Sequence, residues 1–187
     1  IIFPLIFFIF SVIWILLLGF ASPLALVSGF VFGKLTGTLI SILSFTIGCT
    51  ILYFLALLYF KEVIYNNLSG KFLKLKYLFN KNEFLYFFIF RLAGGGGIPF
   101  AIQNILPVIF DMKIKNYFFS TLLGLVPATF VINSLGSGIE KIIENDKAPS
   151  LIETFLSPEI YFPLIGFAII LLLSYFLKKK FFRSDDK

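Results

Sequence analysis

The first twenty residues, Ile1–Phe20, contain no charged side chain. A helix of this length is about 30 Å long, which matches the hydrocarbon core of a bilayer. The segment lacks the basic start and the small-residue cleavage site of a secretory signal, so we expect a retained transmembrane helix. Because backbone polar groups in lipid must be satisfied within the protein, we expect an all-α membrane protein.

Composition supports a membrane protein over a soluble one. The 187 residues are 59% hydrophobic and only 14% charged, whereas soluble domains average about 25% charged residues. The net charge of +6 comes from lysines and arginines beside apolar spans, where they fix topology and contact anionic lipid headgroups. We therefore expect no nucleic-acid partner.

Several kinds of chemistry lack their usual residues. The sequence has no histidine, which removes the usual general base and the commonest transition-metal ligand. The single cysteine, Cys49, excludes an intramolecular disulfide. No carboxylate pair or metal-ligand cluster falls in an apolar segment. We therefore expect neither an enzyme nor a bound metal or cofactor.

Charge distribution predicts the topology of the second half. The basic section 61–83 and the basic tail 178–187 are placed in the cytoplasm, and the acidic loop 136–159 outside. Between the two basic regions lie three apolar segments, 84–110, 112–135 and 160–177. Three crossings would put the basic regions on opposite sides. One segment must turn back, and 84–110 is expected to be a re-entrant hairpin, while 112–135 and 160–177 cross.

The same count of membrane crossings applies to the first half. If 1–20 crosses outward and 39–60 returns, 21–38 is expected to be a short re-entrant piece. Ser44–Gly48 and Ser120–Gly124 share a serine four residues before a glycine, each after a broken segment. The predicted architecture is two inverted repeats, each a re-entrant hairpin plus a transmembrane helix, with flanking transmembrane helices in a single membrane domain.

The broken segment "RLAGGGGIPFAIQNILP" carries the candidate binding residues. Arg91 either binds a lipid phosphate bidentately, or has a structural role in which it satisfies the C-terminal helix carbonyls or snorkels to the surface. Gly95 and Gly96 either form a tight hairpin tip or offer backbone amides to an anion. Gln103 and Asn104 either clamp free backbone groups or bind a headgroup. The spacing Gly-Gly-Gly-Gly lacks the lysine and hydroxyl of a nucleotide-binding P-loop.

The order "FRL…GIPFAIQNILPVIF…NYFFSTLLGLVPATFVINSLGSG" is similar to the VTT domain of the SNARE-associated Golgi protein family and its DedA-like relatives. The matching positions are Arg91, Pro99, Phe100, Asn104, Phe118, Thr121, Gly124, Pro127 and Gly136. The likeness extends over Pro23–Gly138. Roles in hairpin and helix packing are expected for Pro23, Gly29, Gly33, Gly37, Gly48, Pro99, Pro107, Gly124 and Pro127.

The chain also departs from the family pattern. "AGGGG" replaces the proline that usually follows the arginine, and Lys61 is the nearest base to the end of the first-repeat helix. No acidic residue precedes Glu62, so a proton-coupled mechanism through an early carboxylate is not expected.

The resemblance implies an integral membrane lipid transporter or scramblase. It would move phospholipid or lipid-linked phosphate headgroups between leaflets through a polar groove formed by the hairpins. Its partners would be membrane phospholipids with anionic headgroups, and a homo-oligomer is compatible with it. We expect it in a bacterial inner (plasma) membrane. A small-solute or ion carrier on the same scaffold, and a non-transporting membrane assembly factor, stay open as alternatives.

Overall fold

The computed structural model describes residues 2–59, 76, 79–144 and a few positions between 161 and 176, which are 161, 165, 166, 168, 169, 172, 173 and 176. The predictions for the tail 178–187 lie outside the described residues. So do those for most of the basic section 61–83, the second half of the acidic loop 136–159, and most of the span 160–177.

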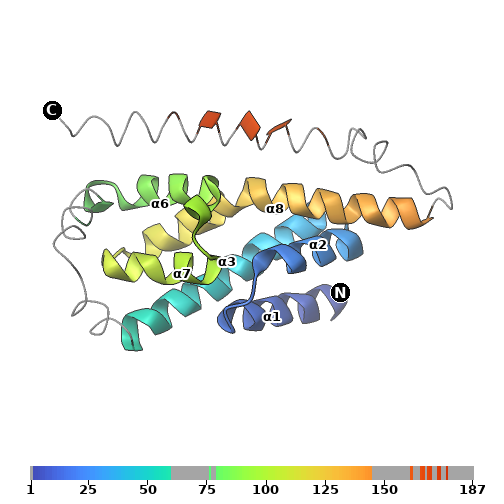
Figure 1. Cartoon of the computed structure of the whole chain (residues 1–187). Helices are drawn as coiled ribbons and strands as arrows, with labels where there is room; N and C mark the ends of the chain where they lie inside the picture. Colours follow the sequence, from blue (N-terminus) through green and yellow to red (C-terminus); the bar gives the residue numbers. More distant parts are fainter. Residues whose placement is uncertain are drawn as a thin grey trace.

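The described residues are helical and contain no strand. The helices are α1 (Ile2–Leu16), α2 (Ala21–Phe32), α3 (Lys34–Tyr59), α6 (Glu83–Leu92), the short 3₁₀ helix η1 (Gly94–Gly97), α7 (Phe100–Ile109) and α8 (Ile114–Glu144). Figure 1 shows α6 and α2 lying along α8 at different points of its length. Each half of the chain therefore supplies two shorter helices followed by a long one.

Two helices are long and apolar enough to cross a membrane, Lys34–Tyr59 and Ile114–Ile139, with 26 residues each. α3 begins at Lys34 rather than at residue 39, because Gly33 with φ 75° breaks the chain in a single residue. α8 continues past residue 135 to Glu144. The shorter helices are also apolar, and their exposed side chains form a surface suited to lipid, which includes Ile2, Phe3, Leu5, Ile6, Ile9, Phe10 and Ile13 on α1.

Glycines allow α2 and α8 to approach until their backbones touch. A Cβ added to Gly29 would lie 2.1 Å from the carbonyl oxygen of Asn133. A Cβ added to Gly136 would lie 2.1 Å from the carbonyl oxygen of Leu26. This pairing runs the two helices in opposite directions. Small residues at such crossings are the usual basis of helix association in lipid, where apolar burial gives no preference for protein over tails.

The two halves repeat one packing contact with an offset of 76 positions, from 48 to 124 and from 15 to 91. A Cβ on Gly48 of α3 would meet Ile15 Cβ of α1 at 2.9 Å. A Cβ on Gly124 of α8 would meet Arg91 Cβ of α6 at 2.5 Å. The same offset relates Pro23 to Pro99 and Ser44 to Ser120. These contacts support a repeated unit, while the opposite membrane orientation of the halves stays a prediction.

The backbone contact between α2 and α8 predicts a large effect of one methyl group. Gly29→Ala should lower the free energy of unfolding by about 1–3 kcal/mol, because the new Cβ overlaps the Asn133 carbonyl. Thermal unfolding of the purified chain in detergent measures this. Gly166→Ala is the matched control, since no described atom lies within 4 Å of its Cβ. Equal melting temperatures for the two variants would contradict the predicted crossing.

Candidate functional site

Arg91 is placed by α6, whose ends are both fixed. Asn82 begins the helix by accepting a hydrogen bond on Oδ1 from the Leu85 amide at 3.2 Å. The Glu83 carboxylate accepts from the Lys113 amide at 2.9 Å and from Asn116 Nδ2 at 3.0 Å. These contacts tie the start of α6 to the start of α8. Arg91 lies in the last turn of α6, where it faces Gly124 of α8.

The guanidinium of Arg91 is buried and bonded to neutral oxygens. It is 2% exposed and donates to Gln103 Oε1 at 3.2 Å, to Asn104 Oδ1 at 2.5 Å and to the Tyr117 hydroxyl at 3.2 Å. These hydrogen bonds of Arg91 go to side-chain oxygens and not to helix carbonyls, and its burial differs from that of a snorkelling side chain. The side chain points into the protein and binds side-chain oxygens.

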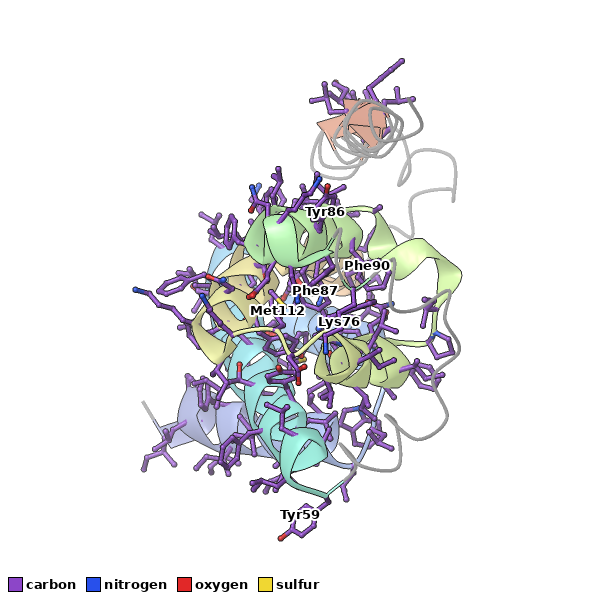
Figure 2. All side chains as sticks on the ribbon, turned by 90° about the vertical axis from the view of Figure 1, so that its left-hand side faces the viewer. Tyr59, Lys76, Tyr86, Phe87, Phe90 and Met112 are labelled. Atoms are coloured by element: carbon purple, nitrogen blue, oxygen red, sulfur yellow. The ribbon has the colours of Figure 1, made fainter. Side chains whose placement is uncertain are left out.

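Aromatic rings surround the same cation. The guanidinium carbon lies 4.9 Å from the centroid of the Phe87 ring, 5.4 Å from that of Phe100 and 6.0 Å from that of Tyr117. The negative faces of aromatic rings attract cations, most strongly where water is excluded. Figure 2 shows Phe87 inside the bundle beneath α6, whereas Tyr59 lies at the periphery. The rings replace part of the hydration that burial removes.

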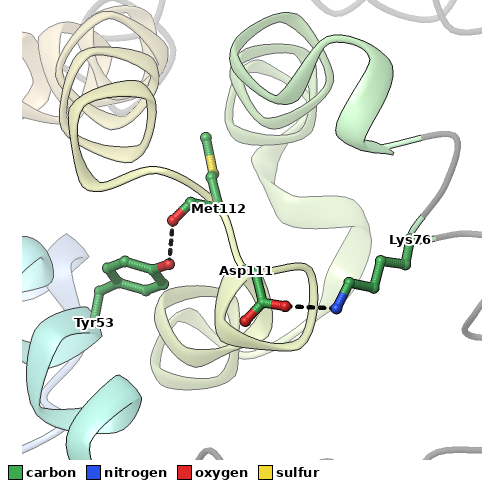
Figure 3. Close-up of polar contacts among 4 residues, drawn as sticks. All are labelled: Tyr53, Lys76, Asp111 and Met112. Carbon is green, nitrogen blue, oxygen red and sulfur yellow. Dashed lines mark hydrogen bonds and ion pairs between the residues drawn. The ribbon is translucent and has the colours of Figure 1, made fainter.

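No carboxylate among the described residues balances this charge. The described ion pair is elsewhere, between Lys76 and Asp111 at 2.5 Å (Figure 3). Arg91 Nε, Asn104 Nδ2 and Thr121 Oγ1 are buried without a hydrogen-bond partner in the described part of the chain. Two of these three groups are nitrogen donors beside an uncompensated positive charge. The arrangement therefore has unused capacity for an anion.

The connection between α6 and α7, here called the glycine tip, is built around Gln103. Its Nε2 donates to the Ile98 carbonyl at 2.6 Å and lies 3.5 Å from the Gly94 carbonyl. Gly94 and Gly95 have φ of 67° and 71°, and a Cβ on Gly95 would lie 2.1 Å from Gln103 Cδ. Only glycine fits this tip without strain. Gln103 therefore clamps the backbone with its nitrogen and holds Arg91 with its oxygen.

The predicted binding residues are in part brought together. Arg91, Gln103 and Asn104 form one cluster, and Gly95 lies against Gln103. Gly96 is in η1, where its backbone belongs to the tip. The predicted packing residues divide in two groups. Gly29, Gly37, Gly48 and Gly124 lie at close contacts between helices. Gly33 lies at the break after α2, and Pro23 lies in the first turn of α2. Pro99 caps the start of α7, while Pro107 and Pro127 lie inside α7 and α8.

Tyr117 is the site residue that sequence reasoning missed. It is fully buried, accepts from Arg91 and donates to the Cys49 carbonyl at 3.3 Å. Its ring stacks on Tyr53 at 4.5 Å and on Phe87 at 5.2 Å. Figure 3 shows the next connection, in which Tyr53 donates to the Met112 carbonyl at 2.5 Å. The available signal was a tyrosine among phenylalanines, since a buried tyrosine hydroxyl needs a partner.

Tyr117→Phe tests the hydroxyl without disturbing the stacked rings. It leaves one Arg91 donor without its acceptor and removes the additional bond to the Cys49 carbonyl, so we expect about 1–3 kcal/mol of lost stability. Tyr59→Phe on α3 is the control, because Tyr59 is 73% exposed. Thermal unfolding in detergent gives the comparison. If Tyr117→Phe melts no lower than Tyr59→Phe, the hydroxyl does not hold this cluster.

Comparison with known proteins places this site within a family. No solved structure matches the chain. The family model of the VTT domain matches residues 19–138, which include α2, α3, α6, α7 and most of α8. The match covers more than half of the 187 residues and all of the Arg91 cluster. With its membrane-length helices, the chain is an integral membrane protein that belongs to the VTT domain family of SNARE-associated Golgi and DedA proteins.

Proposed function

We propose that the protein moves phospholipid or lipid-linked phosphate headgroups between membrane leaflets, with Arg91 as the phosphate-binding group. The observation that carries the proposal is the buried guanidinium with no carboxylate partner among the described residues. The family match supports a membrane protein of the VTT domain family. The lipid transport activity is our proposal.

Energetics favour a functional role for Arg91. An unpaired charge in an apolar interior is costly, and an arginine at membrane depth is unfavourable by roughly 2.5–3.5 kcal/mol on insertion scales. Three neutral oxygens and three ring faces offset part of that cost. An apolar side chain of similar volume would avoid it entirely. Ile15, which has the equivalent contact in the first half, shows that the packing position itself does not need a cation.

Arginine suits a phosphate better than any other cation. Its planar fork places two parallel N–H groups against two phosphate oxygens, and the exclusion of water strengthens both bonds. Arg91 Nε is without a partner in the described residues, so one edge of the fork still has a free donor. Asn104 Nδ2 is a second unused donor. A headgroup phosphate would satisfy the free donor of Arg91 and neutralise the charge.

The membrane setting that we propose follows the charge distribution. In this proposed setting α3 and α8 would cross and the α6–η1–α7 segment would enter and return, so that the Arg91 cluster would lie at depth between the leaflets. We further propose that the section 61–83 and the C-terminus face the cytoplasm of a bacterial inner membrane. Headgroups would then pass along the hairpins while their acyl chains stay in lipid.

A small-anion carrier is the second candidate. It is favoured by the 2% exposure of Arg91, because the guanidinium is enclosed by protein rather than open to lipid. Such a carrier would move a soluble anion down its gradient and would not exchange lipids. The same reconstituted vesicles distinguish the two activities.

Reconstituted protein should accelerate the exchange of short-chain fluorescent phosphatidylglycerol between leaflets, measured by extraction of the outer-leaflet lipid with albumin. Arg91→Ala should slow that exchange about tenfold or more, because it removes charge-assisted hydrogen bonds to the phosphate. Lys34→Ala is the matched control, since Lys34 is an exposed cation at the far start of α3.

The outcomes separate the candidates. Exchange no faster than in empty vesicles would contradict lipid transport. Uptake of a fluorescence-quenching anion without lipid exchange would support the small-anion carrier. Equal slowing by Arg91→Ala and Lys34→Ala would show that a general loss of positive charge, rather than the site, is responsible.

A further inference from the structure

We propose that α7 is the gate of the Arg91 site, and that Gln103 and Asn104 hold the gate closed by occupying Arg91 in place of an anionic ligand. The gate rests on the proposed function, in which Arg91 binds a phosphate. It changes the role of the two amides from substrate ligands to intramolecular competitors of the substrate.

The competition follows from where the acceptor oxygens come from. Gln103 Oε1 and Asn104 Oδ1 are neighbours on α7, and both accept from Arg91 on α6. Two oxygens presented side by side resemble two oxygens of a phosphate. Neutral amide oxygens form weaker hydrogen bonds with a guanidinium than charged phosphate oxygens do. A phosphate can therefore displace them, provided that α7 moves away.

Movement is required because the site is closed. Arg91 is 2% exposed, Asn104 1% and Tyr117 0%, so a headgroup cannot reach the guanidinium in this conformation. Two short connections flank α7. Its start follows the four glycines of η1, and its end leads into a turn at Asp111, where φ is 51°. Both connections can absorb a change in direction.

α7 is also less firmly packed than its counterpart in the first half. Its main packing partner is α3, whereas α2 packs on both α3 and α8 and touches the α8 backbone at Gly29 and Gly136. Two other contacts of Arg91 do not lie on α7. Tyr117 belongs to α8 and Phe87 to α6, so both would keep the cation in place after α7 leaves, whereas the Phe100 ring would leave with α7.

The closed state is incompletely bonded. Arg91 Nε and Asn104 Nδ2 lack partners in the described residues, although both are buried. Unpaired buried donors raise the free energy of a conformation. Closure is therefore stable enough to exclude water and weak enough to be reversed by a ligand.

Cys49 is a built-in reporter of the gate. It is the single cysteine of the chain, it is fully buried, and it lies on α3, the helix against which α7 packs. Its carbonyl accepts from Tyr117, which places it next to the Arg91 cluster. Opening of α7 should expose the thiol. When reclosing is fast, its modification rate by a maleimide measures the population of the open form.

The test compares maleimide labelling of Cys49 in the full chain, purified in an uncharged detergent. We call the hydrogen bonds from Arg91 to Gln103 and Asn104 the latch. Asn104→Asp turns the Asn104 bond of the latch into an ion pair with Arg91, so labelling should slow about fivefold or more. Asn104→Ala removes one latch bond, so labelling should accelerate about fivefold. Ser134→Ala is the matched control, because its buried hydroxyl bonds only the Phe130 carbonyl of its own helix in the described structure. Its labelling rate should stay at the wild-type value.

Lipid exchange gives the second measurement. Asn104→Asp should exchange lipid more slowly than wild type although Arg91 is intact, and Asn104→Ala should be no slower than wild type. If Asn104→Asp fails to fold, the comparison of Asn104→Ala with Ser134→Ala tests the same contact, and equal labelling of these two variants would overturn the gate. Labelling of Asn104→Asp at or above the rate of Asn104→Ala would also overturn it. So would exchange by Asn104→Ala as slow as that of Arg91→Ala, because Asn104 would then be a substrate ligand.

Failure of the gate differs from failure of the proposed function. If labelling follows the predicted order but wild type exchanges no lipid, α7 is a gate and lipid transport is wrong. If wild type exchanges lipid and Arg91→Ala slows it, while the latch variants label at the wild-type rate, Arg91 acts without this gate.

Discussion

The buried guanidinium of Arg91, held by neutral oxygens, is the interaction on which the site depends. Its hydrogen bonds join α6 to α7 through Gln103 and Asn104, and α6 to α8 through Tyr117. A single carboxylate would hold it more strongly, yet none of the described residues provides one. The neutral oxygens stabilise the buried charge without neutralising it. Arg91 can therefore still bind an anion, and can do so reversibly.

The fold supports the Arg91 cluster with close contacts between helices. α2 and α8 meet through glycines with backbone contact, and Gly124 gives Arg91 room against α8. The glycine tip before α7 allows the chain to reverse, because Gly94 and Gly95 adopt φ of 67° and 71°. The equivalent contact in the first half has Ile15 instead of arginine, so the two halves share a packing design and only one carries the charge.

Local features were predictable from the sequence and long-range ones were not. Four glycines between apolar runs predicted a break, and a break there brings Arg91 near Gln103 and Asn104, which lie close along the chain. Tyr117 was missed because its contacts with Arg91 and Cys49 depend on how α8 packs against α6 and α3. The early start of α3 was missed because one glycine with positive φ ended α2 where a longer broken segment was expected.

Direct binding of a phosphate amphiphile is the measurement closest to the central claim that Arg91 is an anion site. Native mass spectrometry of the full chain in an uncharged maltoside detergent can count bound dodecyl phosphate. Arg91→Met removes the charge and keeps a long flexible side chain. We predict saturable binding of one dodecyl phosphate to the wild type and at least about tenfold weaker binding to Arg91→Met. Equal binding by both proteins would contradict the assignment of Arg91 as the phosphate-binding residue.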